Sequence, residues 1–89
     1  MARKHILFSG QVQGVGFRYH STVLARQLGL TGWVRNLDDG DVEMEIQGKP
    51  ETIELFLASL GKTSRYIQID AMKIIEQEEI IEHSFYERY

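Results

Sequence analysis

The hydrophobic and polar positions predict, in the first third of the chain, a strand, a glycine-rich loop and a helix. Residues 4 to 12 alternate loosely between apolar and polar side chains before a cluster of glycines. Apolar residues then recur at helical spacing from Phe17 to Leu28, and Gly29 follows where a left-handed residue would end the helix. Two stripes are compatible with this helix, namely Thr22, Ala25 and Leu28, or Val23, Leu24 and Leu28.

The next segment predicts a β-hairpin. Residues 31 to 35 and 41 to 47 have strand-like patterns, and Asp38-Asp39-Gly40 between them is a turn sequence in which the glycine supplies the positive φ. The second strand alternates cleanly, so one of its faces should be buried and the other exposed. The expected inner residues are Val42, Met44 and Ile46, and the outer ones are Glu43 and Glu45.

The last third predicts a second helix followed by two strands. The pattern predicts Pro50 at the first helical position, and Gly61 ends a clear i, i+3, i+4, i+7 stripe. That stripe consists of Ile53, Phe56, Leu57 and Leu60. Residues 66 to 75 carry β-branched side chains at a two-residue period, and residues 84 to 89 predict a short final strand. The glutamate-rich stretch from 76 to 82 is expected to be a solvated turn.

The order β-α-β-β-α-β predicts an α+β, ferredoxin-like fold, in which two helices cover one face of an antiparallel sheet. With 89 residues, of which 43% are hydrophobic and 26% charged, we expect one folded domain spanning residues 1–89.

Charge and cysteine content narrow the function classes. The formal net charge of -3 argues against broad binding to nucleic acid or to anionic membranes, so any bound anion must be held locally. The absence of cysteine excludes disulfides and suits a reducing compartment. The N-terminal apolar run, Ile6 to Phe8, is too short for a signal peptide or a membrane span. We therefore expect a cytoplasmic monomer that binds neither nucleic acid nor membrane.

The segment GQVQGVGFR, residues 10 to 18, is a candidate anion site. Backbone N–H groups at a helix N-terminus lack partners, and Gly14 and Gly16 can turn successive N–H groups inward as a nest. Arg18 adds a planar fork that matches two phosphate oxygens. The segment fits neither the P-loop nor the dinucleotide fingerprint. From spacing alone, a plain glycine-rich turn beside a surface arginine remains an equal alternative.

Three motifs together resemble the acylphosphatases over nearly the whole chain: GQVQGVGFR, then GWVRNLDDGDVEMEIQG at residues 32 to 48, and FYERY at residues 85 to 89. The resemblance implies the same fold and hydrolysis of the carboxyl–phosphate bond of small acyl phosphates, without metal or organic cofactor. It also implies that Arg18 binds the phosphate oxygens and that Asn36 positions the attacking water. The implied phosphate cradle is the backbone amides of Gln13, Gly14, Val15, Gly16, Phe17 and Arg18.

The chemistry of such a substrate explains why the motifs contain no acid–base pair. An acyl phosphate expels a carboxylate, whose conjugate acid has a pKa of about 4 to 5, so the leaving group needs no general acid. The neutral amide of Asn36 can orient a water but cannot take its proton at pH 7. We expect that proton to pass to the phosphate of the substrate itself.

The other polar and aromatic candidates are expected to be structural. The three histidines are scattered, and the aspartates are explained by the hairpin turn rather than by a calcium loop: His5, His20 and His83, and Asp38, Asp39 and Asp41. Arg35 should point away from Asn36 and be solvated. Trp33 should share the face of Arg35, Phe17 should pack under the loop, and Tyr89 should tie down the chain end.

Residues 63 to 70 depart from the pattern usual in the resembled family, which leaves the register of the fourth strand open. A second hypothesis is a non-catalytic anion- or RNA-binding ferredoxin-like module, which the net charge disfavours. A third is a carbamoyl-phosphate-handling domain of the kind found in larger maturation proteins. The freestanding length favours the enzyme over this third hypothesis.

Overall fold

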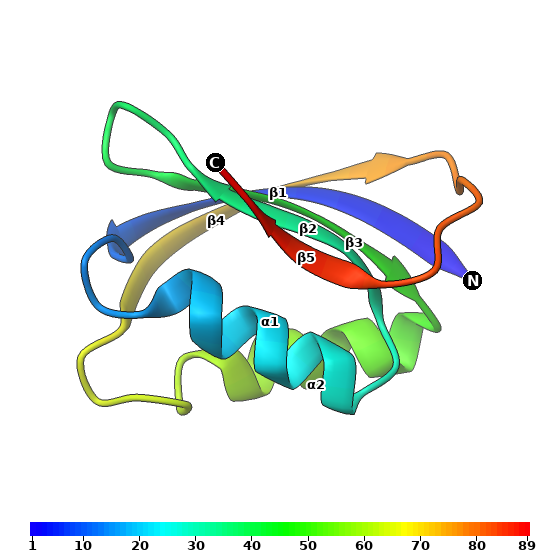
Figure 1. The fold of residues 1–89 in the computed structure, drawn as a ribbon, viewed down its shortest axis with the longest axis horizontal. Helices are drawn as coiled ribbons and strands as arrows, with labels where there is room; N and C mark the ends of the chain where they lie inside the picture. The colour runs from blue at the N-terminus through cyan, green and yellow to red at the C-terminus, as the bar shows by residue number, and fades with distance from the viewer.

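A computed structural model describes all of residues 1–89 as one five-stranded sheet with two helices packed beneath the same face (Figure 1). The elements follow the predicted order: β1 (Ala2–Gln11), α1 (Phe17–Gln27), β2 (Thr31–Asn36), β3 (Val42–Gly48), α2 (Pro50–Leu60), β4 (Gln68–Gln77) and β5 (Phe85–Arg88). The strands lie side by side in the order β4-β1-β3-β2-β5. The expected α+β, ferredoxin-like architecture is confirmed.

The expectation of a purely antiparallel sheet is wrong at one edge, because β5 runs parallel to β2. β1 and β2 are both antiparallel to β3, so they share a direction, and β4 is antiparallel to β1. The end of β4 therefore lies at the end of the sheet where β2 begins. The connection after β4 crosses this end of the sheet to the far edge. β5 must therefore run in the same direction as β2, and the sheet becomes mixed.

The predicted inner face of the hairpin is confirmed, since Val42, Met44 and Ile46 are all fully buried against the helices. The burial of α1 selects the first of the two possible stripes: Thr22 and Ala25 are buried, whereas Val23 is exposed. In α2 the predicted stripe is also buried, through Ile53, Phe56 and Leu60.

The opposite, helix-free face carries ion pairs. Arg35 points away from Asn36 and its side chain is 41% exposed, in line with the expected solvated charge, and it also pairs with Glu43. His5 Nε2 lies 2.7 Å from another oxygen of the same carboxylate. Burial alone would raise the pKa of the Glu43 carboxyl. The hydrogen bonds donated by His5 and Arg35 outweigh that effect and hold the pKa below its usual value of 4.5.

The connection between β4 and β5 is only partly the solvated turn expected for residues 76 to 82. Residues 76 and 77 belong to β4, and further along Glu82 accepts a hydrogen bond of 2.7 Å from the buried Arg3. The amide of Gln47 donates to the Ile80 carbonyl at 2.8 Å and accepts from the Ile80 N–H at 3.0 Å. These contacts fasten the connection to the helix-free face and thereby fix where β5 begins.

β4 starts at Gln68, two residues later than predicted, because Arg65 and Tyr66 form a turn instead of extending the strand. The register left open by the sequence is set by a bulge at Ser9 and Gly10, where Gly10 has a φ of 128°. A Cβ at Gly10 would lie 2.2 Å from the Gln68 carbonyl oxygen, so this close approach requires glycine.

Candidate functional site

The loop between β1 and α1 is held at both ends by buried apolar side chains. Val12 and Phe17 are each 1% exposed, and the Phe17 ring lies 5.0 Å from that of Phe8. Phe17 thus packs under the loop, as expected from the sequence. Between these anchors, Gly14 and Gly16 are exposed, and Val15 is partly buried against the core.

Two glycines give the loop its curvature. Gly14 has a φ of 75° and Gly16 a φ of 80°, both in the left-handed region that other residues enter at a cost of about 1–2 kcal/mol. Gly16 is also the N-cap of α1 and, having no side chain, leaves the first amides of the helix uncapped. Both positions therefore keep backbone N–H groups available for a ligand.

Hydrogen bonding within the protein leaves these amides unused. The backbone N–H groups from Gln13 to Tyr19 donate to no carbonyl and no side chain, and the first helical donation is from His20 to the Gly16 carbonyl at 2.9 Å. Unpaired amides at a helix N-terminus, where the helix dipole is positive, form a site for an anion. The structure brings together all the amides that were predicted for the cradle: Gln13, Gly14, Val15, Gly16, Phe17 and Arg18.

The Gln13 side chain ties this loop to the β2–β3 hairpin, a role that the sequence did not indicate. Its amide nitrogen donates to the carbonyls of Leu37 and Asp41, each at 2.7 Å. Leu37 directly follows Asn36 at the end of β2. The cradle and the candidate water-positioning residue are consequently fixed to each other by two hydrogen bonds.

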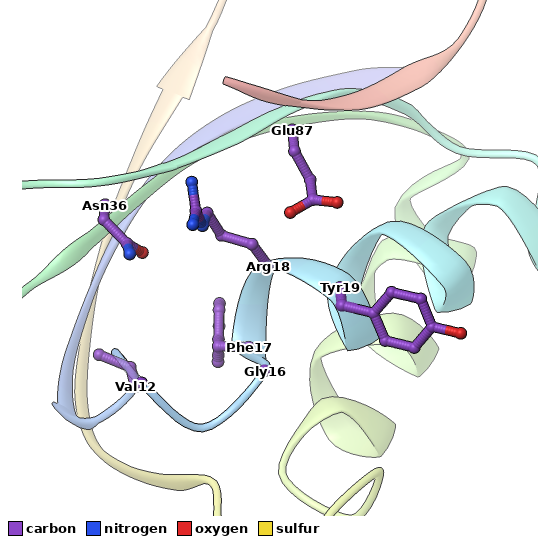
Figure 2. Close-up of a pocket in the computed structure, with 8 residues that line it drawn as sticks. Val12, Gly16, Phe17, Arg18, Tyr19, Asn36 and Glu87 are labelled. Atoms are coloured by element: carbon purple, nitrogen blue, oxygen red, sulfur yellow. The ribbon is translucent and has the colours of Figure 1, made fainter. Parts of the chain in front are cut away.

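Asn36 and Arg18 meet in one pocket, although they are 18 positions apart in the chain. The pocket has a volume of about 210 Å³, and Figure 2 shows both side chains reaching into it from β2 and from the first turn of α1. Its lining comprises Val12, Gly14, Gly16, Phe17, Arg18, Tyr19, Asn36 and Glu87. The Asn36 amide makes no hydrogen bond within the protein, so both its donor and its acceptor remain available.

Arg18 has no carboxylate partner. One terminal nitrogen donates to the Arg88 carbonyl at 3.4 Å, and the guanidinium lies 4.6 Å from the centre of the Tyr89 ring. These neutral contacts orient the side chain without compensating its charge. Tyr89, expected to tie down the chain end, is 95% exposed and is held only by this stacking.

Glu87 is the residue of this pocket that the sequence analysis missed. It lies on β5 opposite the fully buried Val34, so it faces the helices and not the open side of the sheet. The alternation from Phe85, which is buried, to Glu87 two residues later indicates the same face and was available in the sequence. Glu87 makes no hydrogen bond or ion pair, and Figure 2 shows its carboxylate directed toward the first turn of α1.

The remaining candidates lie outside the pocket, and His20 is the nearest to it. A Cβ added to Gly16 would be 3.4 Å from the His20 ring, so the imidazole packs behind the loop and lines none of the cavity. No three His, Cys, Asp or Glu side chains gather in a metal-binding arrangement, and neither helix has the length and apolar composition to cross a bilayer.

The fold and the pocket together have the features of a ferredoxin-like protein that holds a phosphate-sized anion between backbone amides and an arginine. Comparison with known proteins identifies the family. The acylphosphatase family model matches residues 4–87. An acylphosphatase of Methanospirillum hungatei is 43% identical over 79 residues, which cover 88% of this chain and 87% of that protein. The chain belongs to the acylphosphatase family, and it is an enzyme.

Solved structures agree with this assignment. The crystal structure of acylphosphatase from Bacillus subtilis superposes with a TM-score of 0.92 at 32% identity and covers 100% of both chains. The crystal structure of HypF from T. kodakarensis contains a similar domain, with a TM-score of 0.86 and 33% identity over 100% of this chain but only 12% of HypF. The same domain therefore occurs by itself and within a much longer chain.

Proposed function

We propose that the 13–18 loop, Arg18 and Asn36 carry out the reaction of this enzyme, the hydrolysis of the carboxyl–phosphate bond of acyl phosphates. The observation that supports this assignment most strongly is the set of unpaired amides from Gln13 to Tyr19 beside an arginine without a counterion. A dianionic phosphoryl group provides acceptors for the unpaired amides and a counterion for the arginine. A plain glycine-rich turn would not require both features to line one cavity.

In the proposed complex, the loop amides and the Arg18 guanidinium bind the nonbridging oxygens of the phosphoryl group. Phosphoryl transfer through a loose transition state places its charge on these same oxygens, so donors fixed in advance stabilise it. The two glycines and the buried anchors Val12 and Phe17 keep the donors in place before the substrate arrives. The protein supplies position and electrostatics and forms no covalent bond to the substrate.

Asn36 then orients a water for in-line attack on phosphorus. The new water oxygen–phosphorus bond forms as the phosphorus–carboxylate oxygen bond breaks, and the carboxylate departs with the bonding electron pair. The proton of the water passes to a phosphoryl oxygen of the substrate. Because a carboxylate is a stable leaving group, no general acid is required at the bond that breaks.

We further propose that the enzyme acts as a cytoplasmic monomer on a small acyl phosphate and not on nucleic acid. A chain without cysteine is suited to a reducing compartment, and its formal net charge of -3 disfavours a polyanionic partner. An RNA-binding module is the competing assignment. It predicts binding of single-stranded RNA that weakens steeply with salt and no release of phosphate.

Release of inorganic phosphate from benzoyl phosphate tests the assignment of Arg18 and Asn36. Arg18→Ala and Asn36→Ala should each lower kcat/KM on the order of a hundredfold or more, comparable to removing an oxyanion donor. Arg65→Ala is the matched control, because Arg65 also stacks on a tyrosine but lies outside the pocket. Full activity of Arg18→Ala would show that the phosphate site is elsewhere.

A further inference from the structure

Glu87 is a negative charge in a pocket that should receive another. A cavity of about 210 Å³ is only about 7 Å across, so the carboxylate of Glu87 lies close to any group that fills it. The other polar side chains that line this pocket are Arg18 and Tyr19 from α1 and Asn36 from β2, and none forms an ion pair with Glu87. The carboxylate is therefore free of an ion-pair partner when the ligand binds.

The geometry of in-line displacement indicates which part of the substrate meets Glu87. Attacking and leaving oxygens lie on opposite sides of phosphorus. Figure 2 shows Asn36 and Glu87 on opposite sides of the Arg18 guanidinium. With the water held at Asn36, the departing acyl group extends toward Glu87, and the phosphoryl group stays between them.

We infer that Glu87 is a specificity-determining residue, which disfavours acyl phosphates carrying a second negative charge near the carbonyl and favours those carrying a cationic or N–H-donating group there. This inference rests on the proposed function, since it takes the water at Asn36 as given. A unit charge about 7 Å away, partly screened by water, changes binding by roughly three- to tenfold. The kcat/KM for a cationic acyl group should therefore exceed that for an anionic one by about tenfold or more.

Three benzoyl phosphates that differ in the charge of one substituent test the inference: the parent compound, the 3-carboxy derivative and the 3-trimethylammonio derivative. In the wild type, kcat/KM should be highest for the cationic derivative and lowest for the anionic one, after correction for their uncatalysed reactivities. Glu87→Gln keeps the shape and removes the charge, so the cation-to-anion ratio should fall about tenfold. Glu54→Gln, an exposed glutamate on α2, should leave the ratio unchanged.

Two results would overturn the inference while the proposed function stands. One is an unchanged cation-to-anion ratio in Glu87→Gln, and the other is a wild type whose kcat/KM is no higher for the cationic derivative than for the anionic one. Binding of inorganic phosphate provides a measurement that does not depend on turnover. Glu87→Gln should bind phosphate about three- to tenfold more tightly than the wild type, and equal dissociation constants would contradict the electrostatic role. Absence of turnover in the wild type would instead contradict the proposed function.

Discussion

Gln13 joins the two halves of the candidate site, and removing its side chain tests whether that junction matters for catalysis. Gln13→Ala abolishes the two hydrogen bonds of 2.7 Å to the carbonyls of Leu37 and Asp41. Each is worth about 0.5–1.5 kcal/mol, so the free energy of unfolding should fall by about 1–3 kcal/mol. For a domain of this size, a loss of 1 kcal/mol lowers Tm by about 4–8 °C.

The loop should remain folded in this variant because Val12 and Phe17 still anchor its ends. What is lost is the fixed position of Asn36 relative to the cradle, and displacements of this kind lower kcat/KM by about tenfold or more. Benzoyl phosphate hydrolysis and thermal unfolding should be measured on the same preparations. A double-mutant cycle makes the test specific: in an Asn36→Ala background, Gln13→Ala should reduce kcat/KM less than twofold, on the order of a few tenths of a kcal/mol.

Gln47 offers a matched control. It too is a glutamine that makes two hydrogen bonds to backbone groups, here the N–H and carbonyl of Ile80, and it accepts a third from the buried Arg3, but it lies on the helix-free face away from the pocket. Gln47→Ala should lose at least as much stability as Gln13→Ala and keep full kcat/KM. If Gln13→Ala and Gln47→Ala have the same activity, or if the effects of Gln13 and Asn36 are simply additive, the junction has no catalytic role.

Three further predictions follow from the same structure. Gly14→Ala places a Cβ in open space, so only the left-handed φ opposes the substitution. The free energy of unfolding, or the transition-state stabilisation calculated from kcat/KM, should fall by about 1–2 kcal/mol. Gly14→Asn should lose less in the same phosphate-release assay, because asparagine tolerates this region better. Gly32→Ala would place a Cβ 1.9 Å from the Glu45 carbonyl oxygen, so circular dichroism should show loss of more than about 4 kcal/mol of stability or an unfolded chain. Glu43 has a lowered pKa, so its ionised form contributes stability that is present above pH 4.5 and is lost as pH falls through the folded-state value; the Tm difference between wild type and Glu43→Gln should therefore shrink as pH falls below 4.5.

The sequence alone indicated the elements of this fold because their patterns are local. The stripe of α2 needs only the 3.6-residue period, and the alternation of residues 42 to 46 needs only the pleat of a strand. Gly29 and Gly40 were predicted to adopt positive φ, and both do. The glycine-bearing loop directly before a helix was predictable for the same reason, since its residues are contiguous in the chain.

Features that depend on how distant elements meet were not available from the sequence. The parallel alignment of β5 follows from which end of the sheet the chain crosses, and the contacts of Arg35 and Glu82 follow from which strands become neighbours. The start of β4 depends on the bulge at Gly10, which arises where β1 pairs with a segment almost sixty residues further along the chain. Local propensity contains none of this information.

The same division applies to the site. The sequence indicated the loop amides after two glycines and the arginine beside them, because these depend on residue type and on immediate neighbours, whereas Asn36 was assigned only through the resemblance to the acylphosphatases. Only the tertiary structure decided that Asn36 is fastened to the cradle through Gln13 and that Glu87 closes the same cavity from the far edge of the sheet. Hydrogen bonds and charges act over a few ångströms of space, and sequence separation does not measure that distance.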